Sequence, residues 1–519
     1  MKGNYSRNEL EAFGAPCVVI GAGFLGITVA LQLARAGVKV IVIPGGDDEF
    51  SATSSELAMG SNLNVELHES LERNRPRVIG GNSKTWGGRI AGLDDDDFVA
   101  RPWLDLPSWP ITKESIRPYI VSAAQLFGAT YFDAITDAER EPEVIKGFDN
   151  HEVISDGLET WVKNRNFYDF HLKELESSPQ IMLARNFHAV KLFTQEFSRD
   201  FEGLEVGRVG EGTFKLNFGF AVLAAGAIEN AKMLLILEQE NPRSIGGASS
   251  FVGKSYMTHS LTRIPSIQRP EGLDLDSVAY QGMQIKRSLR LTKEFKEKIG
   301  IGNASVMFTP PDINLSSPQS ITHHGVRIIR KYGRQLPSKI WNYRSTIFQS
   351  FKNDKSVSQN FDKHNHLPYL LLWGEHLPNS SSKIFLGEKR DSFGQSLANA
   401  TLVFSDLDKK TLLETSKAIA RRLNQFRDVP IDSDWSAISE LMDHDLAEPN
   451  SHGHQIGGTI MGTSAKDSVT DIWGEAHEWK RVFCTGSSVF PTGGFAAPTL
   501  TAMALAIRTS EAIIQRLRS

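Results

Sequence analysis

Short apolar runs separated by glycine turns open the chain. Residues 15–20 form a β-branched run that predicts a buried strand, and apolar residues at helical spacing follow the next turn until Gly37 ends the pattern. Residues 38–43 form a second apolar run. Strand, glycine turn, helix and strand within about 30 residues predict a Rossmann βαβ unit, in which a helix joins two parallel strands.

The same alternation returns further along the chain. Residues 220–225 read as a strand closed by a glycine, and residues 227–237 read as the helix that follows it. Glycine-rich turns return from residue 452, and the chain ends in an apolar helical run over 498–517 with Pro498 at its first position. These scattered segments predict an α/β fold with a discontinuous Rossmann-type domain.

Glycine turns are sparse between these segments, where alternating strands and helices predict an inserted α+β domain that binds the substrate. Two or three domains fit a length of 519 residues at roughly 150 residues per domain. The predicted Rossmann-type domain comprises residues 1–110, 181–265 and 451–519, and the predicted substrate domain comprises residues 111–180 and 266–450.

The composition is that of an ordinary globular protein, with 40% hydrophobic and 23% charged residues. It excludes a disordered chain, a collagen and a coiled coil. A formal net charge of −4 is too near neutral for a general nucleic-acid-binding protein. The first residues are polar, and no apolar run reaches the ~18 residues of a membrane span. We therefore expect a soluble, cytoplasmic protein without a nucleic-acid partner.

Two cysteines, an acidic run and a basic segment are weaker indications of a functional site. Cys17 and Cys484 lie in apolar runs outside any metal-binding spacing, and we expect them to be inert core residues. We read the acidic run 94–97 as a solvated loop rather than a metal site, and expect no metal ion. Residues 323–344 are basic and interleaved with apolar residues, which favours a solvated basic face packed by its apolar side. A peripheral membrane contact or an anionic substrate remains the alternative for that segment.

The glycine turn after the first strand is the strongest chemical signal. A turn of the form Gly-x-Gly-x-x-Gly lets a pyrophosphate rest on backbone N–H groups at the N-terminus of a helix, where the helix dipole favours negative charge. Gly21, Gly23 and Gly26 fit that pattern. The chemistry serves FAD and NAD alike.

Four further motifs follow in order: the glycine-rich loop 80–88, the strand and helix 222–231, and the segments 454–462 and 486–501. On these motifs the chain resembles the glucose-methanol-choline (GMC) family of FAD-dependent oxidoreductases, in particular its pyranose-oxidase-like and sugar-dehydrogenase-like branches. The resemblance implies FAD as cofactor. It also implies oxidation of a CH–OH group of a sugar, glycoside or polyol to a carbonyl by hydride transfer to flavin N5.

The resemblance also implies roles for single residues. His454 matches the histidine that takes the alcohol proton in such enzymes, a role suited to a side chain that titrates near neutral pH. The helix after Pro498 would stabilise negative charge on the reduced flavin. The residues expected to bind the cofactor are Gly21, Gly23, Gly26, Asp47, Gly80, Gly81, Ser83, Trp86, Gly87, Ala225, Gly226, Ser487, Pro498 and Thr499.

The chain departs from the family pattern at the expected catalytic partner. Ala497 stands where the family has Asn or His, and it offers no hydrogen bond to the substrate oxygen. The candidates for a substitute are His452, His259 and the neighbouring pair Glu375 and His376. Because of this departure, two alternatives stay open: a flavin-dependent reaction other than simple alcohol oxidation, and a flavin-binding subunit without turnover.

Two more departures concern the cofactor. Pro44 stands where the family has a glutamate for the adenosine ribose, and Asp47 is the candidate to replace it. Thr85 stands where pyranose oxidases carry a histidine bonded to the flavin. We therefore expect FAD to bind noncovalently.

Overall fold

The computed structural model describes the chain in separate ranges, and every structural statement below refers to them. The ranges are residues 5–60, 71–72, 74–129, 147–195, 198–241, 251–265, 278–280, 283–309, 369–427, 435–447 and 453–519. The basic segment 323–344 and the candidate His452 lie outside them.

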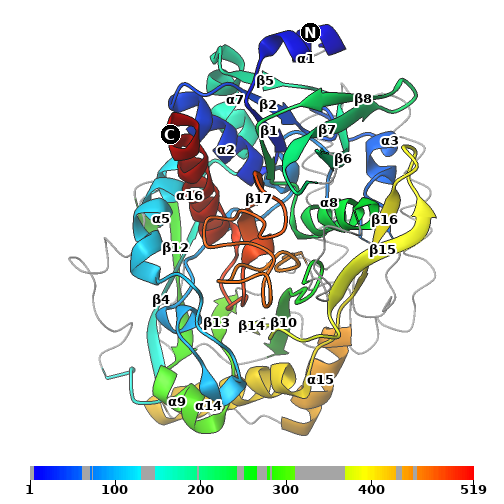
Figure 1. Ribbon diagram of the computed structural model, residues 1–519. Helices are drawn as coiled ribbons and strands as arrows, with labels where there is room; N and C mark the ends of the chain where they lie inside the picture. The colour runs from blue at the N-terminus through cyan, green and yellow to red at the C-terminus, as the bar shows by residue number, and fades with distance from the viewer. Residues whose placement is uncertain are drawn as a thin grey trace, which may run out of the picture.

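A five-stranded parallel sheet forms the upper part of the molecule in Figure 1. Four of its strands are buried over their whole length and the fifth over two of its three residues, as expected for a parallel sheet covered on both faces. Their order is β17 (Val482–Cys484), β9 (Phe220–Leu223), β1 (Cys17–Ile20), β2 (Val40–Ile43) and β5 (Ile181–Leu183). The sheet gathers strands from three distant parts of the chain, which confirms the predicted α/β class.

Helices cover this sheet. The helix α16 (Thr499–Arg518) packs against α2 (Phe24–Arg35) and α5 (Lys113–Leu126), while α8 (Ala227–Glu240) lies on the other side (Figure 1). Pro498 is the residue before α16 rather than its first residue, so the predicted start was early by one position. Its φ of −70° already matches the helix that follows.

A second, seven-stranded sheet lies below the first in Figure 1. Its main path is β10 (His259–Pro265), β14 (Tyr369–Glu375), β13 (Ala304–Thr309), β12 (Met283–Leu291), β4 (Val153–Trp161) and β3 (Arg89–Ile90). The strand β11 (Val278–Tyr280) pairs with β12. The two flanking strands β3 and β10 come from segments that the sequence assigned to the Rossmann-type domain, and the domain boundaries remain a prediction.

The two faces of this second sheet differ because side chains alternate along each strand. One face is apolar and packs on the long helix α14 (Asp406–Arg427), through residues such as Leu289, Val306 and Leu372. The opposite face is polar and nevertheless largely buried. It carries Arg89, Glu159, Ser305, Trp373, Glu375 and His259.

Smaller elements complete the fold. A three-stranded antiparallel sheet consists of β6 (His188–Thr194), β7 (Phe201–Arg208) and β8 (Gly212–Asn217), and a hairpin consists of β15 (Lys383–Arg390) and β16 (Ser396–Thr401). The remaining helices are α1 (Arg7–Phe13), α3 (Ala52–Glu56), α4 (Asp95–Phe98), α7 (Phe167–Ser177), α9 (Lys293–Ile299), α15 (Trp435–Ala447) and the 3-10 turns η1 (Gly81–Lys84), η2 (Pro102–Leu104) and η4 (Gly486–Val489).

Two further predictions can be compared with this fold. Cys17 and Cys484 are free, fully buried residues of the core, as expected. Within the described ranges, no helix combines the length and the apolar character that crossing a bilayer requires.

Candidate active site

The glycine turn between β1 and α2 is shaped by close contacts at two of its three glycines. A Cβ on Gly21, where φ is +104°, would lie 2.6 Å from the carbonyl oxygen of Ala224. A Cβ on Gly26 would lie 1.8 Å from the carbonyl oxygen of Gly21. Gly23 differs, because a Cβ there meets nothing within 4 Å and its φ of −83° suits any residue. The packing of the chain itself therefore does not explain the glycine at position 23.

The second glycine loop lies directly against this turn. The backbone N–H of Gly80 donates to the carbonyl of Ala22 over 2.7 Å, and a Cβ on Gly81 would lie 3.1 Å from the Cα of Gly23. The hydroxyl of Ser83 is buried beside them without a hydrogen-bond partner among the described residues. The structure thus brings the two predicted loops together around an open space at the N-terminus of α2.

Three other predicted cofactor residues already use their polar atoms within the chain. The carboxylate of Asp47 accepts a hydrogen bond of 2.7 Å from Asn186. The indole N–H of Trp86 donates to the carbonyl of Arg165 over 2.7 Å. The backbone N–H of Ala225 donates to the side chain of Asn230 over 3.0 Å. Their part in cofactor binding remains a prediction, and so does that of the exposed Gly87 and of Gly226, which precedes α8.

The C-terminal residues position the segment that carries His454. The hydroxyl of Ser487 donates to the carbonyl of Gln455 over 2.6 Å, and the carbonyl of Ser487 accepts from the N–H of Gly457 over 2.9 Å. These bonds fix the backbone on the C-terminal side of His454. Thr499 begins α16 beyond a fully buried stretch that includes Ala497.

His454 meets a second histidine that lies far away in the sequence. Its Nδ1 is 2.7 Å from Nδ1 of His259, and the two rings stand at 89° to each other. The indole of Trp373 stacks on His454 with 5.4 Å between the ring centroids, and the guanidinium of Arg89 lies 4.5 Å from the centroid of Trp373. No partner of Nε2 of His454 lies within the described part of the chain, and the side chain keeps some exposed surface. One face of this imidazole is therefore held while Nε2 stays open.

The surroundings keep both histidines uncharged at neutral pH. Burial lowers the pKa of His259 to about 4, and the nearby charge of Arg89 acts in the same direction. Burial, the neighbouring His259 and the charge of Arg89 hold the pKa of His454 well below its ordinary value. The sequence suggested a base that titrates near neutral pH, whereas the structure has one that stays deprotonated into the acid range.

Of the candidate substitutes for the missing partner, His259 alone contacts His454 among those the structure describes. His376 accepts a hydrogen bond of 3.2 Å from the N–H of Thr258, and its Nε2 lies 2.9 Å from the carbonyl of Val403. Glu375 binds Arg101 through two hydrogen bonds of 2.5 and 2.7 Å. These two neighbours are thus occupied elsewhere.

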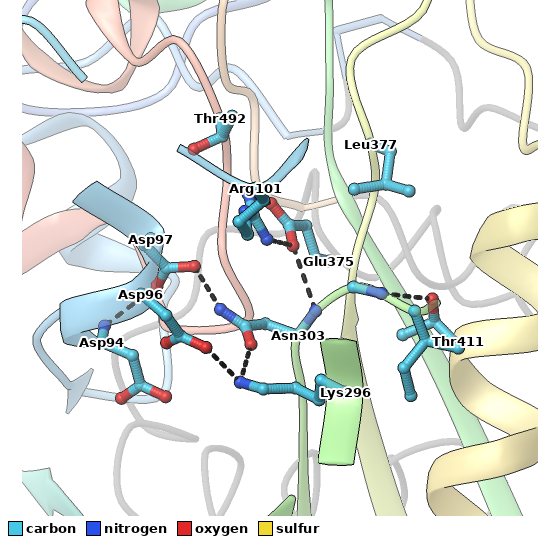
Figure 2. Close-up of polar contacts among 12 residues, drawn as sticks. Asp94, Asp96, Asp97, Arg101, Lys296, Asn303, Glu375, Leu377, Thr411 and Thr492 are labelled. Carbon is cyan, nitrogen blue, oxygen red and sulfur yellow. Dashed lines mark hydrogen bonds and ion pairs between the residues drawn. The ribbon is translucent and has the colours of Figure 1, made fainter. Parts of the chain in front are cut away.

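The acidic run 94–97 is not the solvated loop that the sequence suggested. Residues 95–98 form the short helix α4, and Asp96 and Asp97 are only 7% and 1% exposed. Figure 2 shows the partners of these buried carboxyl groups: Lys296 lies between Asp96 and Asn303, and the amide of Asn303 donates to Asp97 over 2.5 Å. Buried carboxylates need such partners, which are remote in the sequence. Within the described ranges, no group of three or more His, Cys, Asp or Glu side chains is arranged to hold a metal ion.

This buried network supports the loop that leads into α16. Burial raises the pKa of Asp97 to about 8, and the charge of Glu375 adds to the effect. A Cβ on Gly494 would lie 2.6 Å from the Asp97 carboxylate, so the loop passes directly over this group. Thr492 in the same loop accepts a hydrogen bond of 2.8 Å from Trp109. The network, the loop and the histidine pair are therefore neighbours.

Sequence reasoning missed Arg89 and Trp373. Arg89 closes the second glycine-rich loop, and Trp373 interrupts an apolar run just before Glu375. The available signal for Arg89 was a charged residue at the end of that loop. The available signal for Trp373 was the polar end of a buried strand. Neither signal says which side chains meet in space.

A family model described as GMC oxidoreductase matches residues 378–506, the part of the chain that holds His454 and the start of α16. Residues 378–506 match the C-terminal domain of GMC oxidoreductases. The resemblance to this family inferred from the motifs is confirmed, and the assignment to one of its branches remains a prediction.

Two curated relatives have names of the same kind. The chain is 22% identical over 313 residues to a 2-methyl-1,2-propanediol dehydrogenase of Mycolicibacterium austroafricanum, which is 58% of this chain and 49% of that protein. It is 24% identical over 301 residues to the fructose dehydrogenase large subunit of Gluconobacter japonicus, which is 57% of this chain and 47% of that protein. The matched region spans about half the length of each relative.

The fold also resembles solved structures of this type. An FAD-dependent oxidoreductase from Chaetomium thermophilum superposes with a TM-score of 0.57 at 13% identity, covering 97% of this chain and 100% of that one. At this identity the likeness concerns the fold alone.

The residues at the two glycine loops fit the flavin cofactor that such a domain implies. The fit rests on the open space at Gly23, on the unpaired buried hydroxyl of Ser83, and on α2, whose first turn no side chain caps. Free N–H groups at a helix N-terminus are a site for a phosphate group. A pyrophosphate-bearing cofactor would therefore find both room and hydrogen-bond donors there.

Proposed function

We propose that the protein is an FAD-dependent oxidoreductase that oxidises a CH–OH group to a carbonyl. The observation that carries this proposal is the state of His454. Its Nδ1 is bound to His259, its ring is stacked on Trp373, and its Nε2 is open and uncharged at neutral pH. A fixed, deprotonated imidazole with one free nitrogen is what a general base requires.

In the proposed reaction, His454 and the two glycine loops have separate roles. His454 Nε2 takes the hydroxyl proton of the substrate. FAD, when bound, would supply the acceptor for the hydride that leaves the same carbon, so that two electrons and two hydrogens would be removed in all. Gly21, Gly23 and Gly81 hold the cofactor's pyrophosphate at the start of α2, and we propose that this binding is noncovalent because Thr85 cannot form a histidyl bond.

The proposed substrate is a small sugar, glycoside or polyol. The names of the two curated relatives refer to a diol and to a ketose, which supports a polyhydroxylated substrate. The polar buried face of the second sheet agrees with this class, because hydroxyl groups need hydrogen-bond partners when they leave water.

Ala497 favours a second candidate, a flavin protein that does not oxidise simple alcohols. This residue is buried at 3% exposure and has no hydrogen-bonding side chain. Losing an oxyanion donor costs about 100- to 1000-fold in rate in other enzymes. The second candidate predicts bound flavin that alcohols do not reduce.

The deciding experiment is anaerobic titration of the purified protein with a panel of sugars and polyols. The proposal predicts a visible flavin spectrum that bleaches with at least one of them. Flavin that none of them bleaches supports the second candidate. A colourless protein that does not take up added FAD would contradict both.

A further inference from the structure

The contact between the two histidines requires a choice of proton positions. A neutral imidazole carries one N–H, so when two Nδ1 atoms lie 2.7 Å apart one ring donates and the other accepts. If His259 donates, the proton of His454 sits on Nε2, and that atom cannot act as a base. If His454 donates, the lone pair of its Nε2 is free.

The far side of His259 decides between these two arrangements. Its Nε2 is fully buried, and it lies 4.0 Å from the position of a Cβ on Gly493. The backbone of Gly493 and of Gly494 raises the pKa of His259, which is the effect of carbonyl oxygens facing a ring N–H. Nε2 of His259 has no hydrogen-bond partner among the described residues. A proton on Nε2 of His259 is attracted by these oxygens, whereas a lone pair there would be repelled.

With Nε2 of His259 protonated, its Nδ1 is the acceptor. We propose that His259 is a positioning residue that holds His454 in the tautomer with the proton on Nδ1, and so leaves Nε2 free for the substrate hydroxyl. This inference rests on the proposed function. It assigns to His259 a different task from that of the family residue replaced by Ala497, because His259 contacts the base and not the substrate oxygen.

The same arrangement provides for the proton that His454 takes up. The cationic ring keeps its Nδ1–H on the acceptor nitrogen of His259, so the contact strengthens when the charge forms. Two charged groups from the packed elements act on the pair. Glu375 on β14, the cross-strand neighbour of His259, raises the pKa of His259 although it is paired with Arg101, and Arg89 on β3 lowers the pKa of both histidines.

The tautomer can be measured on the resting protein, without turnover. In protein labelled with ¹⁵N-histidine, a protonated ring nitrogen and one with a free lone pair have well-separated chemical shifts. Comparison with His454→Ala identifies the signals of His454. The proposal predicts that neutral His454 is protonated at Nδ1, and a proton found on Nε2 would overturn it. This result does not depend on which substrate is oxidised, so it stands apart from a failure of the proposed function.

Substitution of His259 provides the second test. His259→Phe removes the acceptor, and we expect the rate of flavin reduction to fall at least tenfold. His259→Asn keeps an acceptor oxygen near the place of Nδ1 and should recover most of that loss. His171→Phe is the matched control, because His171 is also buried but bonds to the carbonyl of Leu126, and it should reduce flavin at the wild-type rate.

The pH profile distinguishes positioning of the base from a purely structural role. An accepting Nδ1 on His259 stabilises the cationic form of His454, so His259→Phe should move the acid limb of kcat/KM to lower pH, whereas a loss of packing alone leaves the limb in place. If the limb stays in place, or if His259→Asn is as slow as His259→Phe, His259 does not position the base.

Discussion

Replacing Gly23 by alanine should separate cofactor binding from folding. The backbone there is extended, with φ of −83° and ψ of −164°, and the new Cβ meets no atom of the chain within 4 Å. The fold should therefore tolerate the change, and the loss of chain entropy in the unfolded state stabilises such a variant by about 0.4–1 kcal/mol. Gly23→Ala is expected to unfold at the wild-type temperature or slightly above it.

Cofactor affinity should respond in the opposite way. The methyl group would occupy the open space beside Gly23, where we propose that a pyrophosphate approaches the N–H groups of α2. A hydrogen bond to a charged group contributes about 1.5–3 kcal/mol, so losing one weakens binding about 10- to 150-fold. Titration of the apoprotein with FAD, followed by quenching of flavin fluorescence, measures the change.

Gly26→Ala is the matched control in the same turn. Its Cβ would lie 1.8 Å from a backbone oxygen that cannot move aside. We therefore expect the free energy of unfolding of this variant to fall by about 1–3 kcal/mol, whether or not FAD is present. A Gly23→Ala variant that binds FAD as tightly as the wild type would refute the placement of the pyrophosphate at this turn.

Three further predictions concern single side chains. Acid precipitation should release all the flavin into the supernatant, because Thr85 offers no bond to it, and flavin retained in the pellet would contradict noncovalent binding. The pKa of Asp97 is raised to about 8 by burial and by Glu375, so its contribution to stability is fully present in acid and is lost as the pH rises from about 4 to 8. Denaturant unfolding across this window should therefore show that Asp97→Asn removes a decline of at most about 1.4 kcal/mol per pH unit, and equal slopes for both proteins would contradict the assignment. Ala497→Asn restores an amide at the buried start of α16 and should speed flavin reduction by a generic alcohol, whereas an unchanged rate would mean that another group already serves the substrate oxygen.

The Rossmann-type sheet was predictable because its signals are local. Each of the strands β1, β2 and β9 is a short apolar run beside a glycine turn, and the turn at 21–26 is recognisable from the spacing of its three glycines. A strand that is buried on both faces of a parallel sheet is a nearly continuous apolar run, and this pattern is visible without knowledge of the rest of the chain.

The partners within the site were not predictable, because they meet through long-range packing. His259 and His454 are 195 positions apart, and β10 brings His259 to its place through its pairing with β14. The acidic run 94–97 was misread for the same reason, since Lys296 pairs with Asp96 across 200 positions. A charged run looks solvated in a sequence unless its buried partners are known.

The role of His454 as the base is the centre of this account, and anaerobic stopped-flow of His454→Ala tests it most directly. General-base catalysis contributes about 100- to 10000-fold, so flavin reduction should slow at least 100-fold while FAD stays bound and KM changes little. His477→Ala is the matched control, because His477 lies in the same C-terminal region and bonds to Ser468, and it should keep the wild-type rate. If His454→Ala reduces its flavin at close to the wild-type rate, His454 is not the base, and the proposed alcohol oxidation loses its main support.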